Sequence, residues 1–146
     1  MTEHVKLFFR VERDEDGYPP IGVESLWATP TGRTLEYTVD NIPFYTREAT
    51  LGDVVEAKEE QGALWYSKTV TRSGNSLIRI VFYRPELIAG VRESLDQMGC
   101  STEWVGRQPL VAVNVPVSVD IGSIQAFLEE HARNGSVDYG EPILRQ

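Results

Sequence analysis

Cysteine and long apolar runs are scarce in this sequence, and each scarcity excludes a class of protein. The single cysteine, Cys100, cannot form an internal disulfide or supply a metal cluster, which is compatible with a reducing compartment. No stretch approaches the roughly 18 consecutive apolar residues of a membrane span. The opening residues MTEHVKLFF lack the basic region, apolar region and cleavage site of a secretory signal. We therefore expect a cytoplasmic protein without a membrane partner.

Basic residues are few in comparison with acidic ones. The chain has 14 Lys and Arg against 22 Asp and Glu, which gives a formal net charge of -8. A molecule with this charge repels phosphate backbones and anionic lipid headgroups. Nucleic acid is therefore a disfavoured partner, and the charge favours a basic protein.

The first part of the chain has the pattern of antiparallel strands. In HVKLFFRVE, the apolar residues Val5, Leu7 and Phe9 alternate with polar ones, as in a strand with one buried face. Further strands are predicted at residues 23–29, 34–42, 52–58 and 63–71, and turn-forming residues separate them. This order predicts a bent antiparallel sheet or partial barrel over residues 1–84.

The second part of the chain alternates strands with helices. Pro85 begins a predicted helix that ends at Gly99, and Asp120 is placed to cap a second helix. From residue 77 the order is strand, helix, strand, strand, helix, strand, which is that of a ferredoxin-like βαββαβ unit over residues 77–146. We expect an α+β fold in which the two parts share the strand 77–83 and form one compact body.

Residues with the spacing of a catalytic or phosphate-binding site are hard to find. Neither His4 nor His131 has a nucleophile or an orienting carboxylate at a recognisable spacing. The segment SGNS lacks the patterns of a phosphate loop and of a nucleophile elbow, and we interpret it as a hairpin turn. We expect a protein without catalytic residues or a cofactor.

The segment DEDGYPPIGVESLWA, residues 14–28, combines acidic, turn-forming and aromatic residues. Together with the preceding Glu12, Asp14 and Asp16 match the first positions of a calcium loop, but Val23 stands where a bidentate glutamate is needed, so no metal site is predicted. The glycine and prolines favour a rigid, solvated turn. The tryptophans Trp27 and Trp65 lie in alternating apolar patterns and are predicted to be core residues, whereas Tyr18 and Tyr45 are predicted to be exposed.

Four segments carry a resemblance to a known family: DGYPPIGVESLWA (16–28), NIPF (41–44), LGDVVEA (51–57) and GALWYSKTVTRSGNSLIRI (62–80). With them the sequence resembles, over nearly its whole length, the bacterial domain of unknown function number forty-two sixty-five. The resemblance implies a small cytoplasmic bacterial protein, of a type whose genes can sit beside those of secreted antibacterial toxins. It transfers no catalytic residue.

Our hypothesis is a protein-binding module without catalysis, namely an immunity protein that neutralises a basic toxin domain by covering its active site. The motivation is the absence of a catalytic arrangement, the negative charge, and the tyrosines beside acidic turns. The predicted partner-binding residues are exposed acidic or aromatic side chains: Asp14, Glu15, Asp16, Tyr18, Tyr45, Glu129, Glu130 and Asp138.

Two alternatives remain open. One is an enzyme or small-ligand domain with a pocket between the sheet and the C-terminal unit, for which the candidate residues are Arg72, Arg79, Asp53 and Cys100. The other is an RNA- or ribosome-associated factor that uses a basic stripe of Lys68, Arg72 and Arg79, which the net charge disfavours.

Overall fold

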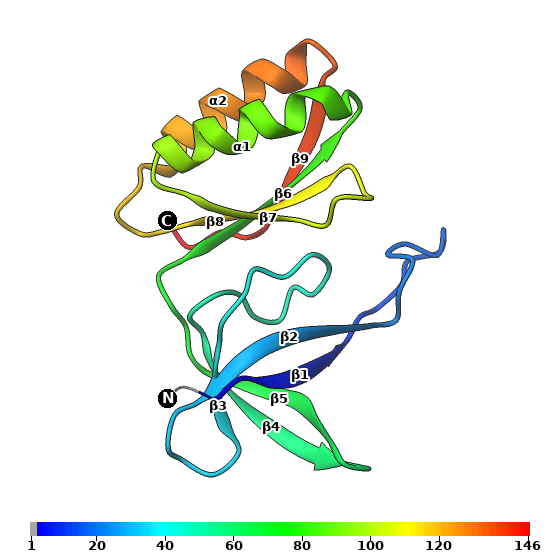
Figure 1. Cartoon of the computed structure of the whole chain (residues 1–146), viewed down its shortest axis with the longest axis vertical. Helices are drawn as coiled ribbons and strands as arrows, with labels where there is room; N and C mark the ends of the chain where they lie inside the picture. Colours follow the sequence, from blue (N-terminus) through cyan, green and yellow to red (C-terminus); the bar gives the residue numbers. More distant parts are fainter. Residues whose placement is uncertain (1–2) are drawn as a thin grey trace. The chain divides into compact units, whose positions relative to one another are not determined.

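The computed structural model describes residues 3–146 and divides the chain into two units, with the boundary between Ser73 and Gly74 (Figure 1). The first unit is built of strands alone within its described residues, and the second combines a sheet with helices. The predicted α+β class is thereby confirmed. In the part of the chain from residue 3 onward, no helix has the length and apolarity to cross a membrane.

The first unit is a five-stranded closed barrel. Successive strands pair antiparallel, and the first strand also pairs in parallel with the fifth, at Leu7 with Leu64 and Phe8 with Trp65. This parallel pairing closes the barrel, whereas the sequence predicted only a bent antiparallel sheet or a partial barrel. The strands are β1 (Val5–Arg10), β2 (Val23–Pro30), β3 (Glu36–Val39), β4 (Val54–Glu60) and β5 (Ala63–Thr71).

Alternation along β1 and β2 decides which side chains fill the barrel. Leu7 and Phe9 of β1 and Leu26 and Ala28 of β2 are almost fully buried. Trp27 stands between two inward residues and therefore points outward, with 47% of its surface exposed. The prediction that Trp27 is a core residue is wrong.

Trp65 also lies against residues from the outward positions of β1. Its ring centroid is 5.5 Å from that of Phe8, and the guanidinium carbon of Arg10 is 4.1 Å from the Trp65 ring centroid. The side chain is partly buried, and it packs with Phe8 and Arg10 on the outer face of the barrel.

The second unit is an antiparallel sheet with α1 and α2 on one face (Figure 1). Its strands stand in the order β7, β8, β6, β9. Buried residues from β6, β8, β9 and both helices make one apolar core. The elements are β6 (Ser76–Phe82), the 3-10 helix η1 (Pro85–Leu87), α1 (Ile88–Gln97), β7 (Ser101–Trp104), β8 (Leu110–Val115), α2 (Ile121–Arg133) and β9 (Val137–Ile143).

The predicted cap at Asp120 and the predicted stop at Gly99 are confirmed, whereas Pro85 begins the 3-10 helix η1 and α1 itself begins at Ile88. Asp120 is the N-cap of α2 and accepts a hydrogen bond from the Gly122 N–H at 3.3 Å. Gly99 adopts φ +98 directly after the last turn of α1. The Cys100 N–H then donates to the Leu95 carbonyl at 3.0 Å, which satisfies a terminal carbonyl of α1.

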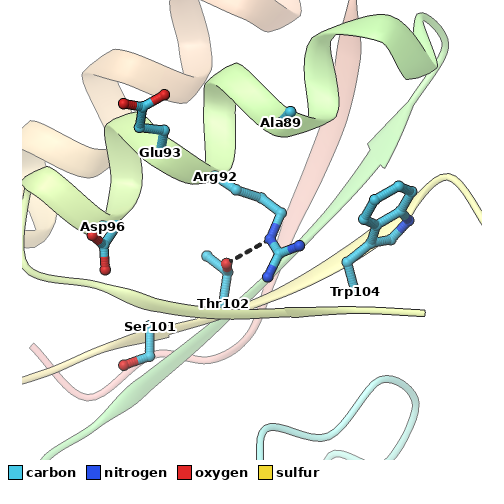
Figure 2. A pocket seen from close by; sticks show the side chains of 7 residues that line it. All are labelled: Ala89, Arg92, Glu93, Asp96, Ser101, Thr102 and Trp104. Atoms are coloured by element: carbon cyan, nitrogen blue, oxygen red, sulfur yellow. Dashed lines mark hydrogen bonds between the residues drawn. The ribbon is translucent and has the colours of Figure 1, made fainter. Parts of the chain in front are cut away.

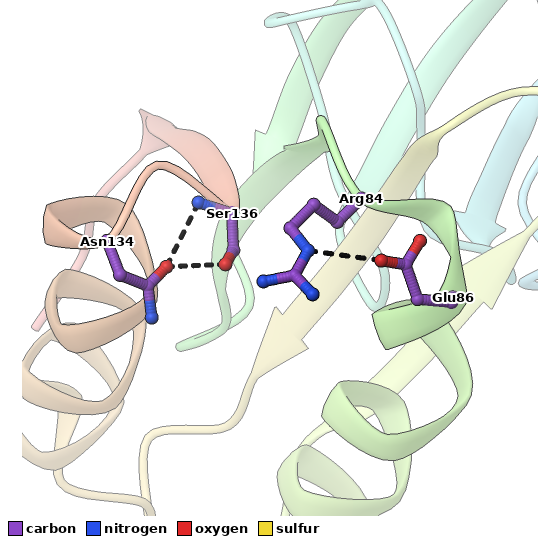
Figure 3. A network of polar contacts seen from close by, with 4 residues as sticks. All are labelled: Arg84, Glu86, Asn134 and Ser136. Carbon is purple, nitrogen blue, oxygen red and sulfur yellow. Dashed lines mark hydrogen bonds and ion pairs between the residues drawn. The ribbon is translucent and has the colours of Figure 1, made fainter.

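Polar contacts also lie at the start of η1 and at the end of α2 (Figure 3). Arg84 Nε donates to Glu86 Oε1 at 3.0 Å, and Asn134 Oδ1 accepts from the Ser136 N–H at 3.0 Å. A backbone hydrogen bond at Glu86 and the Arg84 guanidinium lower the pKa of the Glu86 carboxyl. The first contact lies at the N-terminal end of η1, and the second follows the C-terminal end of α2.

The segment SGNS connects the two units and does not make the hairpin turn that we predicted. Strand β5 pairs with β1 and β4, whereas β6 pairs with β8 and β9. The strand 77–83, expected to be shared, corresponds to β6 and belongs to the second unit. Ser73 is held within the first unit, because its N–H donates to Asp53 Oδ1 at 2.8 Å and its hydroxyl to the Leu51 carbonyl at 2.9 Å.

Candidate functional site

The acidic turn after β1 is ordered by its own first aspartate. Asp14 Oδ1 accepts hydrogen bonds from the backbone N–H groups of Asp16 and Tyr18, each at 2.9 Å. The Asp14 N–H donates to the Tyr18 carbonyl at 2.7 Å, and Gly17 supplies the φ of +80 that the turn requires. Glu15 and Asp16 are exposed on this turn.

Two tyrosines that are far apart in the sequence meet beside this turn. The ring centroids of Tyr18 and Tyr45 are 6.4 Å apart with an interplanar angle of 71°. Tyr18 is 53% exposed and Tyr45 is partly buried. The five residues Asp14, Glu15, Asp16, Tyr18 and Tyr45 are called the acidic-tyrosine surface below.

A buried glutamate holds the loop that carries Tyr45. Glu24 of β2 is 7% exposed, and its carboxylate accepts hydrogen bonds from the N–H groups of Phe44 at 2.7 Å, Tyr45 at 3.1 Å and Thr46 at 2.8 Å. Our reading of the sequence missed this residue. The available signal is that Glu24 occupies the same alternation as the inward-facing Leu26 and Ala28, so a charge points into the barrel and needs donors.

The other predicted partner-binding residues belong to the second unit. Glu130 and Asp138 are exposed, and Glu129 accepts a hydrogen bond from the Tyr139 hydroxyl at 3.1 Å. Arg133 Nε lies 4.0 Å from Glu129 Oε1. Desolvation, followed by the hydrogen bond to Glu129, raises the pKa of the Tyr139 phenol. Glu129 therefore already has partners within its own unit.

A hollow of about 510 Å³ lies between α1 and β7 in the second unit. Arg92 Nε donates to Thr102 Oγ1 at 2.9 Å, and the Arg92 guanidinium carbon is 5.9 Å from the Trp104 ring centroid (Figure 2). Trp104 Nε1 donates to the Gln108 carbonyl at 2.6 Å. The sequence pattern did not reveal this hollow. Its lining residues are Ala89, Arg92, Glu93, Asp96, Ser101, Thr102 and Trp104.

Several of the side chains proposed for a pocket or a basic stripe are buried or already paired within their own unit. Cys100 is 3% exposed, and burial raises the pKa of its thiol to about 11, contrary to what a reactive thiol requires. Asp53 is fully buried and accepts the Thr50 N–H at 3.1 Å. Lys68 forms an ion pair with Glu56 at 3.2 Å. Arg79 belongs to the second unit, whereas Arg72 and Lys68 belong to the first.

His4 has a carboxylate partner that the spacing did not reveal. Its Nε2 lies 2.6 Å from Asp40 Oδ2, and its ring makes a T-shaped contact with that of Trp27 at a centroid distance of 6.3 Å. Among residues 3–146 there is no group of three or more His, Cys, Asp and Glu side chains that could hold a metal ion.

Comparison with known proteins identifies a family and a fold. A family model described as a domain of unknown function (DUF4265) matches residues 24–139, and no curated protein matches the chain. A solved structure of a hypothetical protein from Neisseria gonorrhoeae is similar with a TM-score of 0.74 and 18% identity, covering 100% of this chain and 97% of that one. At this identity the similarity concerns the fold alone. The acidic turn precedes the matched residues, whereas Tyr45 and the hollow lie within them.

Proposed function

Since the chain belongs to the DUF4265 family, whose description assigns no activity, we propose from the geometry that it is a non-catalytic protein-binding module. The proposed contact region is the acidic-tyrosine surface. The observation that carries this proposal is the exposed Tyr18, set on a turn that Asp14 orders and packed edge-on against Tyr45.

Each part of this surface has a physical role in binding. Tyrosine buries a large area with few rotatable bonds, which makes it a frequent interface anchor. A turn that is ordered before binding loses less conformational entropy when the complex forms. Exposed Glu15 and Asp16 are part of the net charge of -8 and would accelerate encounter with a basic partner.

The finer form of the proposal is an immunity protein in the cytoplasm that covers the active site of a basic toxin domain. The net charge and the gene context implied by the family resemblance support this form. The second unit is proposed to be ferredoxin-like, supported by the order β9, β6, β8, β7 in its antiparallel sheet.

The test is affinity capture of the tagged protein from its native cells under conditions in which a stoichiometric partner is retained. The double variant Glu15→Lys and Asp16→Lys leaves Asp14 in place to order the turn. The control, Glu3→Lys and Glu59→Lys, makes the same charge change at two exposed positions of the same unit. We expect the first variant to lose the partner and the control to retain it. Equal retention by both variants would contradict the proposed surface.

A further inference from the structure

The hollow between α1 and β7 is bounded by a helix and by an edge strand. In the order β7, β8, β6, β9, strand β7 has a sheet neighbour on one side only. An edge strand presents backbone N–H and C=O groups to which an extended peptide can pair. We propose that an extended peptide segment of a partner binds here, paired with β7, and places an acidic and a basic group in the hollow.

The charges in the hollow support a peptide of mixed charge. Arg92, Glu93 and Asp96 all line it, and within residues 3–146 none of the three takes part in an ion pair. The Nε–H of Arg92 donates to Thr102, and the terminal N–H groups of its guanidinium would donate to a carboxylate of the peptide. Glu93 and Asp96 are exposed on the same helix and would receive a lysine or arginine of the peptide.

Trp104 and Ala89 give the hollow its apolar part. The hydrogen bond from Trp104 Nε1 to the Gln108 carbonyl fixes one edge of the indole, and the side chain is 37% exposed. Figure 2 places Ala89 and Arg92 on α1 opposite Thr102 and Trp104 on β7. A small side chain on the helix leaves room for an apolar peptide side chain against the indole. A hollow of about 510 Å³ can hold side chains but not a folded domain.

The experiment is a selection of displayed random peptides on the full chain, with the variant Arg92→Glu used to remove peptides that bind elsewhere. Arg133→Glu is the matched control, because it makes the same change at an exposed arginine on α2. Synthetic copies of the enriched peptides are then titrated. We expect Arg92→Glu and Trp104→Ala each to weaken binding about tenfold or more, and Arg133→Glu to change it less than twofold. Failure to enrich peptides that depend on Arg92 would overturn the proposal.

Hydrogen exchange distinguishes pairing with β7 from simple occupation of the hollow. Bound peptide should slow exchange of amides within Ser101–Trp104, whereas free lysine, tested alone, should not. A peptide that binds without protecting any β7 amide would overturn the strand pairing. Free lysine that binds as tightly as the peptide would show a small-molecule site instead. The inference concerns a surface in the second unit and stands or falls separately from the acidic-tyrosine surface in the first.

Discussion

Replacing Glu24 by alanine tests how the Tyr45 loop is held. The variant removes a carboxylate that is 7% exposed and accepts three backbone N–H groups, those of Phe44, Tyr45 and Thr46. Hydrogen bonds to a charged acceptor contribute about 1.5–3 kcal/mol each, and donors left buried add a similar cost. The loop can open and hydrate its amides, which limits the loss. We therefore expect Glu24→Ala to lower the free energy of unfolding by about 3 kcal/mol.

Urea unfolding measures this loss, and amide exchange locates it. The three amides bound to Glu24 should exchange faster in the variant, while amides of the barrel core, such as Leu7, keep their relative protection. Glu24→Gln retains one acceptor oxygen and should fall between the alanine variant and the wild type. Ser25→Ala, at the neighbouring exposed position, is the control and should change stability by about 0.5 kcal/mol or less.

A loss below about 1 kcal/mol for Glu24→Ala, with unchanged exchange at residues 44–46, would refute the reasoning. It would mean that the loop is held by other contacts. Tyr45 would then keep its place beside Tyr18 without Glu24, and the acidic-tyrosine surface would not depend on a buried charge.

Three further predictions follow from the packing. Gly99→Ala should destabilise the protein by about 1–2 kcal/mol in thermal unfolding, because φ at Gly99 is +98 and the new Cβ would lie 2.9 Å from Val119 Cγ2. Gly90→Ala, inside α1 with open space around it, should stabilise the protein by about 0.5–1 kcal/mol. A Gly99→Ala variant more stable than Gly90→Ala would contradict the account. Cys100 should react with a soluble disulfide reagent about a hundredfold more slowly at pH 8 than an unfolded cysteine, because a pKa raised from 9.0 to about 11 leaves that much less thiolate. Because the thiol of the unfolded chain loses its proton at lower pH, the free energy of unfolding should also fall between about pH 9 and pH 11. Rapid labelling of the native protein would contradict the burial of Cys100. Trp27→Ala should cost about 1 kcal/mol and Phe9→Ala about 3–5 kcal/mol in urea unfolding, since Trp27 is 47% exposed and Phe9 is 1% exposed.

Local signals in the sequence were sufficient to predict most elements of the fold. The apolar spacing after Pro85, the cap at Asp120 and the stop at Gly99 all act within one or two helical turns, so one sequence contains the whole signal. Strand alternation worked in the same way for Leu7 and Phe9. The α+β class follows from the order of these elements.

The features that we missed depend on contacts between distant residues. Closure of the barrel requires β1 to pair with β5, and no local pattern indicates a parallel contact. Trp27 was predicted to be a core residue from the alternating pattern around it, whereas in the register of β2 it is Leu26 and Ala28 that face inward and Trp27 points outward. The alternation of β2 indicates that Glu24 points inward, but the groups that Glu24 and Arg92 bind lie in other parts of the chain, so these partners could not be predicted from spacing.

The most direct test of the central proposal is the association rate of the captured partner with the wild type and with the Glu15→Lys, Asp16→Lys variant, each at about 20 mM and about 200 mM salt. If the acidic-tyrosine surface is the contact region, the wild-type rate should fall steeply with salt. The variant should associate about tenfold more slowly at low salt and depend less on salt. Equal rates and equal salt dependence for the two proteins would contradict the account.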